Sequence, residues 1–169
     1  MAIEAYQEFS PSIDPSAMIA GSADLIGRVE IGEEASIWYN VTLRADINKI
    51  VVGKHSNIQD NSCLHVADDF GCIVGDYVTV GHGAILHACT VEDNVLIGMG
   101  SIVLDGAVIG EGSVVGAHAL VTKGTVIPPN SLVLGAPAKV CKDLGPASRE
   151  SNHAWAEKYV RVANSYKKH

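Results

Sequence analysis

The chain has 169 residues and a formal net charge of −7, with 17 Gly but only two Phe and two Trp. Its length suits one domain, and its Val, Ile, Leu and Ala content favours a core of narrow, similar layers. The negative charge, with no Lys/Arg cluster before the last residues, argues against nucleic acid or an anionic membrane surface as a partner. The sequence also shows no secretory leader and no run of about 18 uncharged apolar residues, so we expect a cytoplasmic protein.

The N-terminal half carries a ladder of aliphatic residues, mostly six residues apart, that is broken in three places. The ladder consists of Ile13, Ile19, Leu25, Ile31, Ile37, Leu43, Val52, Ile58, Leu64, Val74, Val80 and Leu86. Extra residues fall around "DINK" after Leu43 and in "ADDFG" after Leu64, and one residue is missing after Leu86. Because breaks in a solenoid usually form projecting loops, often on the binding face, we expect loops at both insertions.

The ladder becomes strictly regular in the second half. From Val91 the aliphatic residue recurs at Ile97, Val103, Ile109, Val115, Val121, Ile127 and Val133. Each unit predicts one short strand and a turn, and three units predict one triangular coil, stacked on the next at about 4.8 Å. The sequence therefore predicts an all-β fold over residues 1–140, a parallel β-helix of hexapeptide repeats.

The repeat stops after "LGAPAKV", and we expect residues 141–169 to form a separate segment containing one C-terminal α-helix. Four residues recur there at helical spacing: Trp155, Tyr159, Val162 and Tyr166. This stripe is expected to pack along the flank of the β-helix or against a neighbouring subunit.

Assigning each hexad to one face of the triangular prism brings distant polar residues together. His65 and His87 fall at the same outward position of one face, one coil apart, and Arg44 occupies this position on the preceding coil. Asp46 lies two residues beyond Arg44. Two imidazoles stacked about 4.8 Å apart are well placed to share a metal ion.

His82 falls on another face and points toward another corner, so that reaching the metal would require crossing an edge of the prism. We therefore expect His82 to come from a neighbouring subunit. A contact of this kind closes into a ring, and a triangular prism makes a homotrimer the simplest ring.

Three neutral imidazoles with an open fourth position are typical of catalytic zinc, although Fe²⁺ or Co²⁺ also suits them. Such a metal supplies hydroxide at neutral pH, for which CO₂ is a suitable electrophile. Gln59 and Asp60 lie one coil before His82 on its face, where they could bind bicarbonate or orient ligands.

The segments "RADINKI", "NIQDNSCLH" and "VGHGAILHACTV", with "IGMGSIVLDGAVIG" and "VLGAPAKV", resemble the gamma-class carbonic anhydrases. The resemblance covers nearly the whole chain. It implies a left-handed β-helix, a homotrimer, and reversible hydration of CO₂ to bicarbonate by a metal-bound hydroxide at subunit interfaces. It implies zinc held by His65 and His87 of one subunit and His82 of the next.

The resemblance also assigns roles to residues around the metal. Arg44 and Asp46 occupy the Arg-x-Asp positions of the family, and Gln59 and Asp60 its Gln-Asp positions. A Tyr on the C-terminal helix can approach the site in relatives, and Tyr159 matches by its helix position, with Tyr166 as the other choice.

The chain departs from the family where proton transfer takes place. Ile47 follows Asp46 where well-known active members carry Glu, and the acidic loop is the short "VADDFG", with Asp68 or Asp69 as proton-transfer candidates or as solvated carboxylates. These departures bear on catalytic rate rather than on metal binding.

Two alternative functions remain: a hexapeptide acyltransferase that uses acyl-CoA with His82 as general base, and a catalytically weak metal-binding scaffold subunit.

Overall fold

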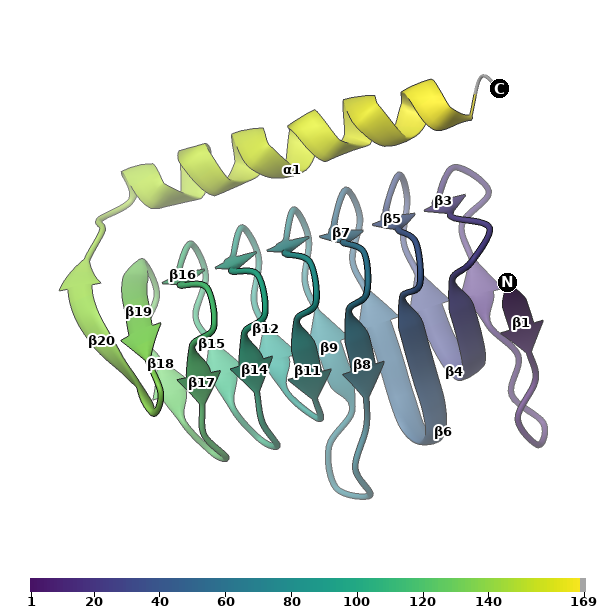
Figure 1. Cartoon of the computed structure of the whole chain (residues 1–169), viewed down its shortest axis with the longest axis horizontal. Helices are drawn as coiled ribbons and strands as arrows, with labels where there is room; N and C mark the ends of the chain where they lie inside the picture. The colour runs from purple at the N-terminus through teal and green to yellow at the C-terminus, as the bar shows by residue number, and fades with distance from the viewer. Residues whose placement is uncertain (168–169) are drawn as a thin grey trace.

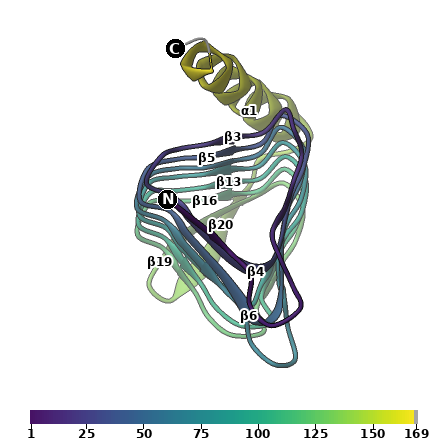
Figure 2. The same cartoon turned by 90° about the vertical axis from the view of Figure 1, so that its right-hand side faces the viewer.

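The chain winds into a left-handed parallel β-helix with one long α-helix along its flank (Figures 1 and 2). This computed structural model describes residues 1–167. Seen from the N-terminal end, the chain turns counter-clockwise as it recedes from the viewer, which is the left-handed sense (Figure 2). The predicted all-β fold and the hand implied by the family resemblance are both confirmed.

The prism has three faces, which we name in chain order. The first face contains β3 (Met18–Ile19), β5 (Ser36–Ile37), β7 (Asn57–Ile58), β10 (Thr79–Val80), β13 (Leu96–Ile97), β16 (Val114–Val115) and β19 (Ser131–Gly135), closed by antiparallel β20 (Ala138–Asp143). The second face contains β1 (Ala2–Glu4), β8 (Cys63–His65), β11 (Ile85–His87), β14 (Ile102–Val103) and β17 (Leu120–Val121). The third face contains β2 (Ser12–Ile13), β9 (Cys72–Val74), β12 (Thr90–Val91), β15 (Val108–Ile109) and β18 (Val126–Ile127). Two long strands, β4 (Asp24–Ile31) and β6 (Thr42–Val52), belong to both the second and third faces.

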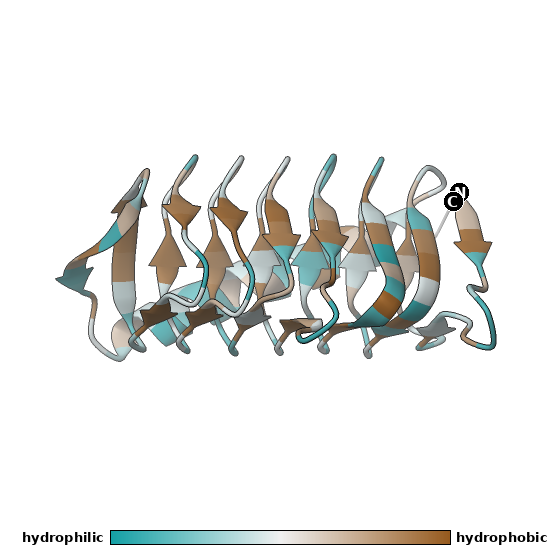
Figure 3. Ribbon diagram, turned by 90° about the horizontal axis from the view of Figure 1, so that it is seen from below, coloured by the Kyte–Doolittle hydropathy of each residue, from teal (hydrophilic) through white to brown (hydrophobic). Residues whose placement is uncertain are grey.

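The observed register is the one that the aliphatic ladder predicts. Ile58 pairs with Val80 on the first face, and Leu64 pairs with Leu86 on the second. These side chains are fully buried and stack along the prism axis, and Figure 3 shows hydrophobic residues recurring at equivalent positions from coil to coil. Glycine is needed where coils meet closely: a Cβ on Gly98 would lie 2.5 Å from a backbone nitrogen of the next coil.

The two insertions in the ladder have different structures. The "ADDFG" segment projects as the predicted loop below β8 and β9 (Figure 1), closed by a hydrogen bond from the Ala67 N–H to the Phe70 carbonyl oxygen. The loop expected at "DINK" is wrong, because β6 continues through it as one strand. Its extra residues form a bulge: β4 pairs with β6 as far as Gly27 and Ala45 and again from Val29 and Ile50, and residues 46–49 fall in the register shift between these two stretches.

The helix α1 (Ala147–Tyr166) runs back over the first face toward the N-terminal coils, in contact with β5, β7 and β10 (Figure 1). The predicted flank position is confirmed, but the predicted contact stripe is only partly right. Tyr159 and Val162 pack against the buried cluster around Trp38, whereas Trp155 and Tyr166 are 45% and 50% exposed. The buried helix positions are instead Ser148, Asn152, Ala156, Val160 and Ala163.

Small residues allow α1 to lie close to the turns of the β-helix. The side-chain amide of Asn152, 3% exposed, donates to the carbonyl oxygens of Asn94, Gly112 and Ser113 at 2.8, 3.3 and 3.2 Å. Residues 168 and 169 of the expected 141–169 segment lie outside the described residues. Within residues 1–167, no helix combines the length and the apolar character needed to cross a membrane.

Candidate metal centre

The structure contains the predicted column of Arg44, His65 and His87. His65 ends β8 and pairs in register with His87 at the end of β11, and Arg44 of β6 pairs with His65 on the other side. Strand alternation directs Leu64 and Leu86 into the core, so the following histidines point outward. His65 Nδ1 lies 3.1 Å from His87 Nε2.

Each of these imidazoles contacts a carboxylate through its other nitrogen. His65 Nε2 lies 3.2 Å from Asp46 Oδ1, and His87 Nδ1 lies 2.6 Å from Asp105 Oδ1. A carboxylate only accepts hydrogen bonds, so in the neutral imidazoles both protons belong on the carboxylate side. The two remaining lone pairs then face each other, so that both can be donated to one metal ion.

The surroundings of His65 disfavour a proton on the pair. Burial, and then the Arg44 guanidinium, hold the pKa of His65 below its ordinary value. Two nitrogens of a tetrahedral zinc site at 2.0–2.1 Å from the metal lie about 3.3 Å apart, close to the separation seen here. The donor chemistry of the pair therefore fits a divalent metal such as zinc.

His82 lies apart from this pair, at the corner between the first and second faces. Its side chain is 47% exposed, and its Nδ1 lies 2.9 Å from Asp60 Oδ2, which leaves Nε2 for another ligand. In the described part of the chain, no group of three or more His, Cys, Asp or Glu side chains could hold a metal within one subunit. Within the subunit, Arg44 pairs with Asp46, and Asp60 contacts His82.

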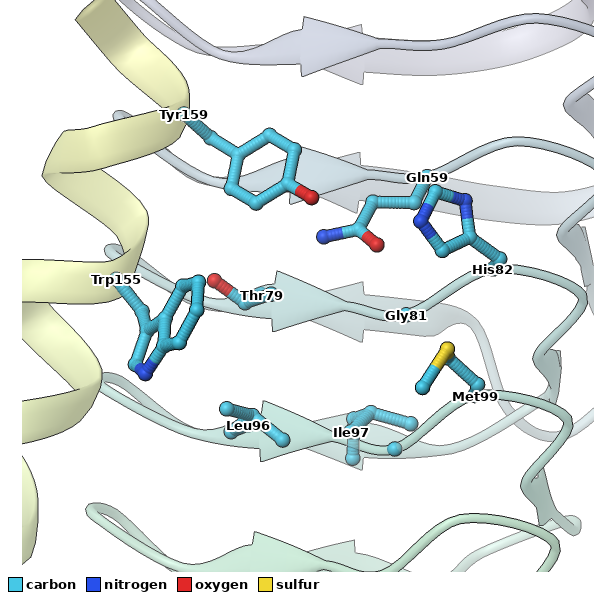
Figure 4. A pocket seen from close by; sticks show the side chains of 10 residues that line it. Gln59, Thr79, Gly81, His82, Leu96, Ile97, Met99, Trp155 and Tyr159 are labelled. Atoms are coloured by element: carbon cyan, nitrogen blue, oxygen red, sulfur yellow. The ribbon is translucent and has the colours of Figure 1, made fainter. Parts of the chain in front are cut away.

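A groove of about 300 Å³ between α1 and the first face contains Gln59, His82 and Tyr159 (Figure 4). The Tyr159 hydroxyl and the Gln59 amide point toward each other across it (Figure 4). Burial, and then the charge of Asp60, raise the pKa of Tyr159, so its hydroxyl stays protonated at neutral pH. The structure thus brings Tyr159 to Gln59, whereas Tyr166 packs against Trp38 at a ring-centroid distance of 5.3 Å.

Buried amides fix the orientation of Gln59. Its Nε2 donates to Asn57 Oδ1 at 3.1 Å, and Asn57 Nδ2 donates to Thr79 Oγ1 at 3.0 Å. Gln59 and Asn57 are 5% and 0% exposed, so these contacts are shielded from water. The Gln59 amide oxygen is thereby left available as a hydrogen-bond acceptor.

Of the two proton-transfer candidates, Asp68 lines a polar cavity of about 280 Å³ that also contains Asp46. The side-chain amide of Asn48 holds the start of this loop, donating to the carbonyl oxygens of Ala67 and Asp68, both at 3.1 Å. Asp69 is exposed and does not line this cavity.

The sequence interpretation missed Asp105. Its signal was present, because Val103 of the ladder pairs with Leu86, and Asp105 lies two residues beyond it on the coil after His87. An Asp directly before a Gly is also typical of an ordinary turn, so composition alone does not distinguish the two roles.

Comparisons with known proteins show which proteins this chain is similar to. The bacterial transferase hexapeptide family (six repeats) matches residues 88–123. A carbonic anhydrase of Geobacillus kaustophilus is 49% identical over 162 residues, which cover 96% of this chain and 89% of that protein. Gamma carbonic anhydrase 1, mitochondrial, of Arabidopsis thaliana is 50% identical over 103 residues, 57% of this chain and 38% of that protein. The solved structure of a putative acetyltransferase from Bacillus cereus is 44% identical with a TM-score of 0.96, covering 99% of this chain and 97% of that one. On these relationships, the chain belongs to the gamma carbonic anhydrase family.

Proposed function

We propose that this protein is a metal-dependent carbonic anhydrase that hydrates CO₂ reversibly to bicarbonate between the subunits of a homotrimer. The observation that carries the proposal is the pair formed by His65 and His87, whose free nitrogens converge at 3.1 Å while carboxylates hold their other nitrogens. Identity to proteins named carbonic anhydrase supports it.

In this proposal, His65 and His87 of one subunit and His82 of its neighbour would hold Zn²⁺, or Fe²⁺ or Co²⁺. Three neutral imidazoles without a thiolate fit a catalytic site that keeps one position open. When bound, the metal supplies Lewis acidity that ionises water near neutral pH. Asp46, Asp105 and Asp60 each hold one of the three histidines in a fixed orientation.

The side chains of the groove would bind the substrate and product. Leu96, Met99 and Trp155 give the groove an apolar wall that suits a nonpolar gas. The Gln59 amide, fixed by Asn57, and the Tyr159 hydroxyl would hydrogen-bond the oxygens of bicarbonate. Proton export would pass through the cavity that Asp68 shares with Asp46.

The test combines metal content with stopped-flow CO₂ hydration on protein purified anaerobically without chelators. We expect about one metal ion per subunit, loss of both metal and activity in His65→Ala or His87→Ala, and retained metal with slower hydration in Tyr159→Phe. Wild-type protein with full metal occupancy and no hydration would refute the catalytic role. It would leave the metal-binding scaffold, a function that the short acidic loop "VADDFG" favours.

A hexapeptide acyltransferase is the second candidate, because the Bacillus cereus relative is named a putative acetyltransferase and His82 borders the groove. In that function His82 acts as a general base and no metal is needed. Metal-free protein that transfers acetyl from acetyl-CoA, with loss of transfer in His82→Ala, would support it over the anhydrase.

A further inference from the structure

We propose that Asp105 is a positioning residue that keeps His87 in the tautomer whose Nε2 lone pair faces His65, and thereby strengthens binding of a divalent metal by the pair. The effect on metal affinity rests on the proposed function. The effect on the His87 tautomer does not, because it is a property of the metal-free protein.

The contacts of Asp105 are directed mainly at His87. Its Oδ1 lies 2.6 Å from His87 Nδ1, whereas its Oδ2 lies 3.9 Å from the ammonium of Lys123, a side chain that is 74% exposed. Aspartate carboxyls are ionised at neutral pH, and one that lies 2.6 Å from an imidazole nitrogen accepts a hydrogen bond from it. An ionised carboxylate requires a proton on Nδ1 and therefore leaves Nε2 as the lone pair.

The backbone around Asp105 is held by coils on both sides. The Gly124 N–H donates to the Asp105 carbonyl oxygen at 2.8 Å, and the Gly106 N–H donates to the Ala88 carbonyl oxygen at 2.7 Å. The Phe70 ring of the projecting loop also covers Gly106, because a Cβ there would meet the ring at 3.4 Å. A carboxylate on so constrained a turn can orient an imidazole with little freedom of its own.

Removing the carboxylate would let the proton of His87 move to the other nitrogen. From Nε2 this proton can be donated to His65 Nδ1, 3.1 Å away, while His65 keeps its own proton toward Asp46. The two facing nitrogens would then share a hydrogen bond, with no cation between them. The lone pair that a metal needs would be occupied, and binding would require moving the proton back.

The first measurement determines the His87 tautomer in metal-free, ¹⁵N-histidine-labelled protein from two-bond ¹H–¹⁵N correlation spectra. We expect the proton on Nδ1 in the wild type and a shift toward Nε2 in Asp105→Ser, a variant that suits a turn. Asp105→Ala repeats the measurement if the Ser variant does not fold. Asp105→Asn keeps an acceptor oxygen and should retain much of the wild-type tautomer.

The second measurement is the affinity for Zn²⁺ and Co²⁺, by competition with a chromogenic chelator. We expect affinity about 10- to 100-fold lower in Asp105→Ser, with a smaller loss in Asp105→Asn. The matched control is Asp93→Asn, because Asp93 also holds a neighbouring coil, through the Asp76 N–H at 2.8 Å, and should keep wild-type affinity.

An unchanged His87 tautomer and unchanged metal affinity in folded Asp105→Ser would overturn the inference. An equal loss of affinity in Asp93→Asn would overturn it too, because the effect would then be general weakening of the coils. If the wild type binds metal but does not hydrate CO₂, the proposed function fails while both measurements still test Asp105. If the wild-type protein binds no metal, the measured tautomer of His87 alone decides whether the inference about Asp105 holds.

Discussion

Replacing His82 in one preparation and His87 in another separates the two halves of the proposed metal site. His87 is held beside His65 on the second face, whereas His82 lies at a different corner, so the proposed three-histidine site would need two subunits. Neither His82→Ala nor His87→Ala alone can then assemble a site. In a mixed trimer, a site is restored where a subunit with an intact pair faces a neighbour with an intact His82.

The recovery follows from random assembly. Each restored site needs the right variant at two adjacent positions, each with a probability of about one half, so about a quarter of wild-type sites should return in an equal mixture. The two variants are unfolded, mixed, refolded together and assayed for bound metal and stopped-flow CO₂ hydration. Both readouts should rise together from near zero to about a quarter of the wild-type value.

Two control mixtures make the result decisive. His65→Ala with His87→Ala should recover nothing, because no subunit keeps the complete pair. His118→Ala, at an exposed His outside the site, mixed with His87→Ala should show about half of the wild-type sites. In that mixture every subunit keeps His82, and about half of the subunits keep the pair of His65 and His87. Full metal binding by His82→Ala alone, or no recovery from hybrid trimers shown to have formed, would refute the shared site.

Three further predictions concern the scaffold that positions the site. Leu64→Ala, at a fully buried position between coils, should lower the free energy of unfolding by about 2–5 kcal/mol in urea titrations. Val126→Ala, at a position 68% exposed, should change it by about 0.5 kcal/mol or less. Gly98→Ala should lower the melting temperature because its Cβ would meet backbone of the next coil, whereas Gly21→Ala meets nothing within 4 Å and should be neutral. Asn152→Ala removes the donor for three carbonyl oxygens and should speed hydrogen exchange in α1, at a cost of about 1–3 kcal/mol.

Other outcomes would show which part of this reasoning is wrong. Equal effects of Leu64→Ala and Val126→Ala would mean that the inward ladder does not dominate stability. A neutral Gly98→Ala would mean that the coils can separate without cost. Unchanged exchange in α1 after Asn152→Ala would mean that apolar contacts alone hold the helix.

The β-helix and the histidine column could be predicted because a hexapeptide repeat determines which residues face inward. Once Leu64 and Leu86 occupy equivalent core positions, His65 and His87 must be neighbours on the outside, whatever the loop between them. A slip of one residue would turn the aliphatic side chains outward. The same reasoning placed Gln59 and Asp60 one coil before His82, and the structure has both beside it.

Other features depended on contacts that no periodicity specifies. The aromatic stripe predicted the helix but only part of its contact face: Tyr159 and Val162 pack on the cluster around Trp38, whereas close approach to the turns favours the Asn152 amide over Trp155. The insertion at "DINK" became a bulge within β6 rather than a projecting loop, because β4 and β6 pair on both sides of it.

By itself, then, the sequence determined the order of the coils, the register of the core and the neighbours along each outer column, because burial of an aliphatic residue every six positions permits only one register. The tertiary structure alone decided the direction of each polar side chain: Asp105 onto His87, Asp60 onto His82 and Tyr159 toward Gln59. These directions depend on hydrogen bonds and local packing between residues of different coils and of α1, and such contacts exist only once the chain has folded.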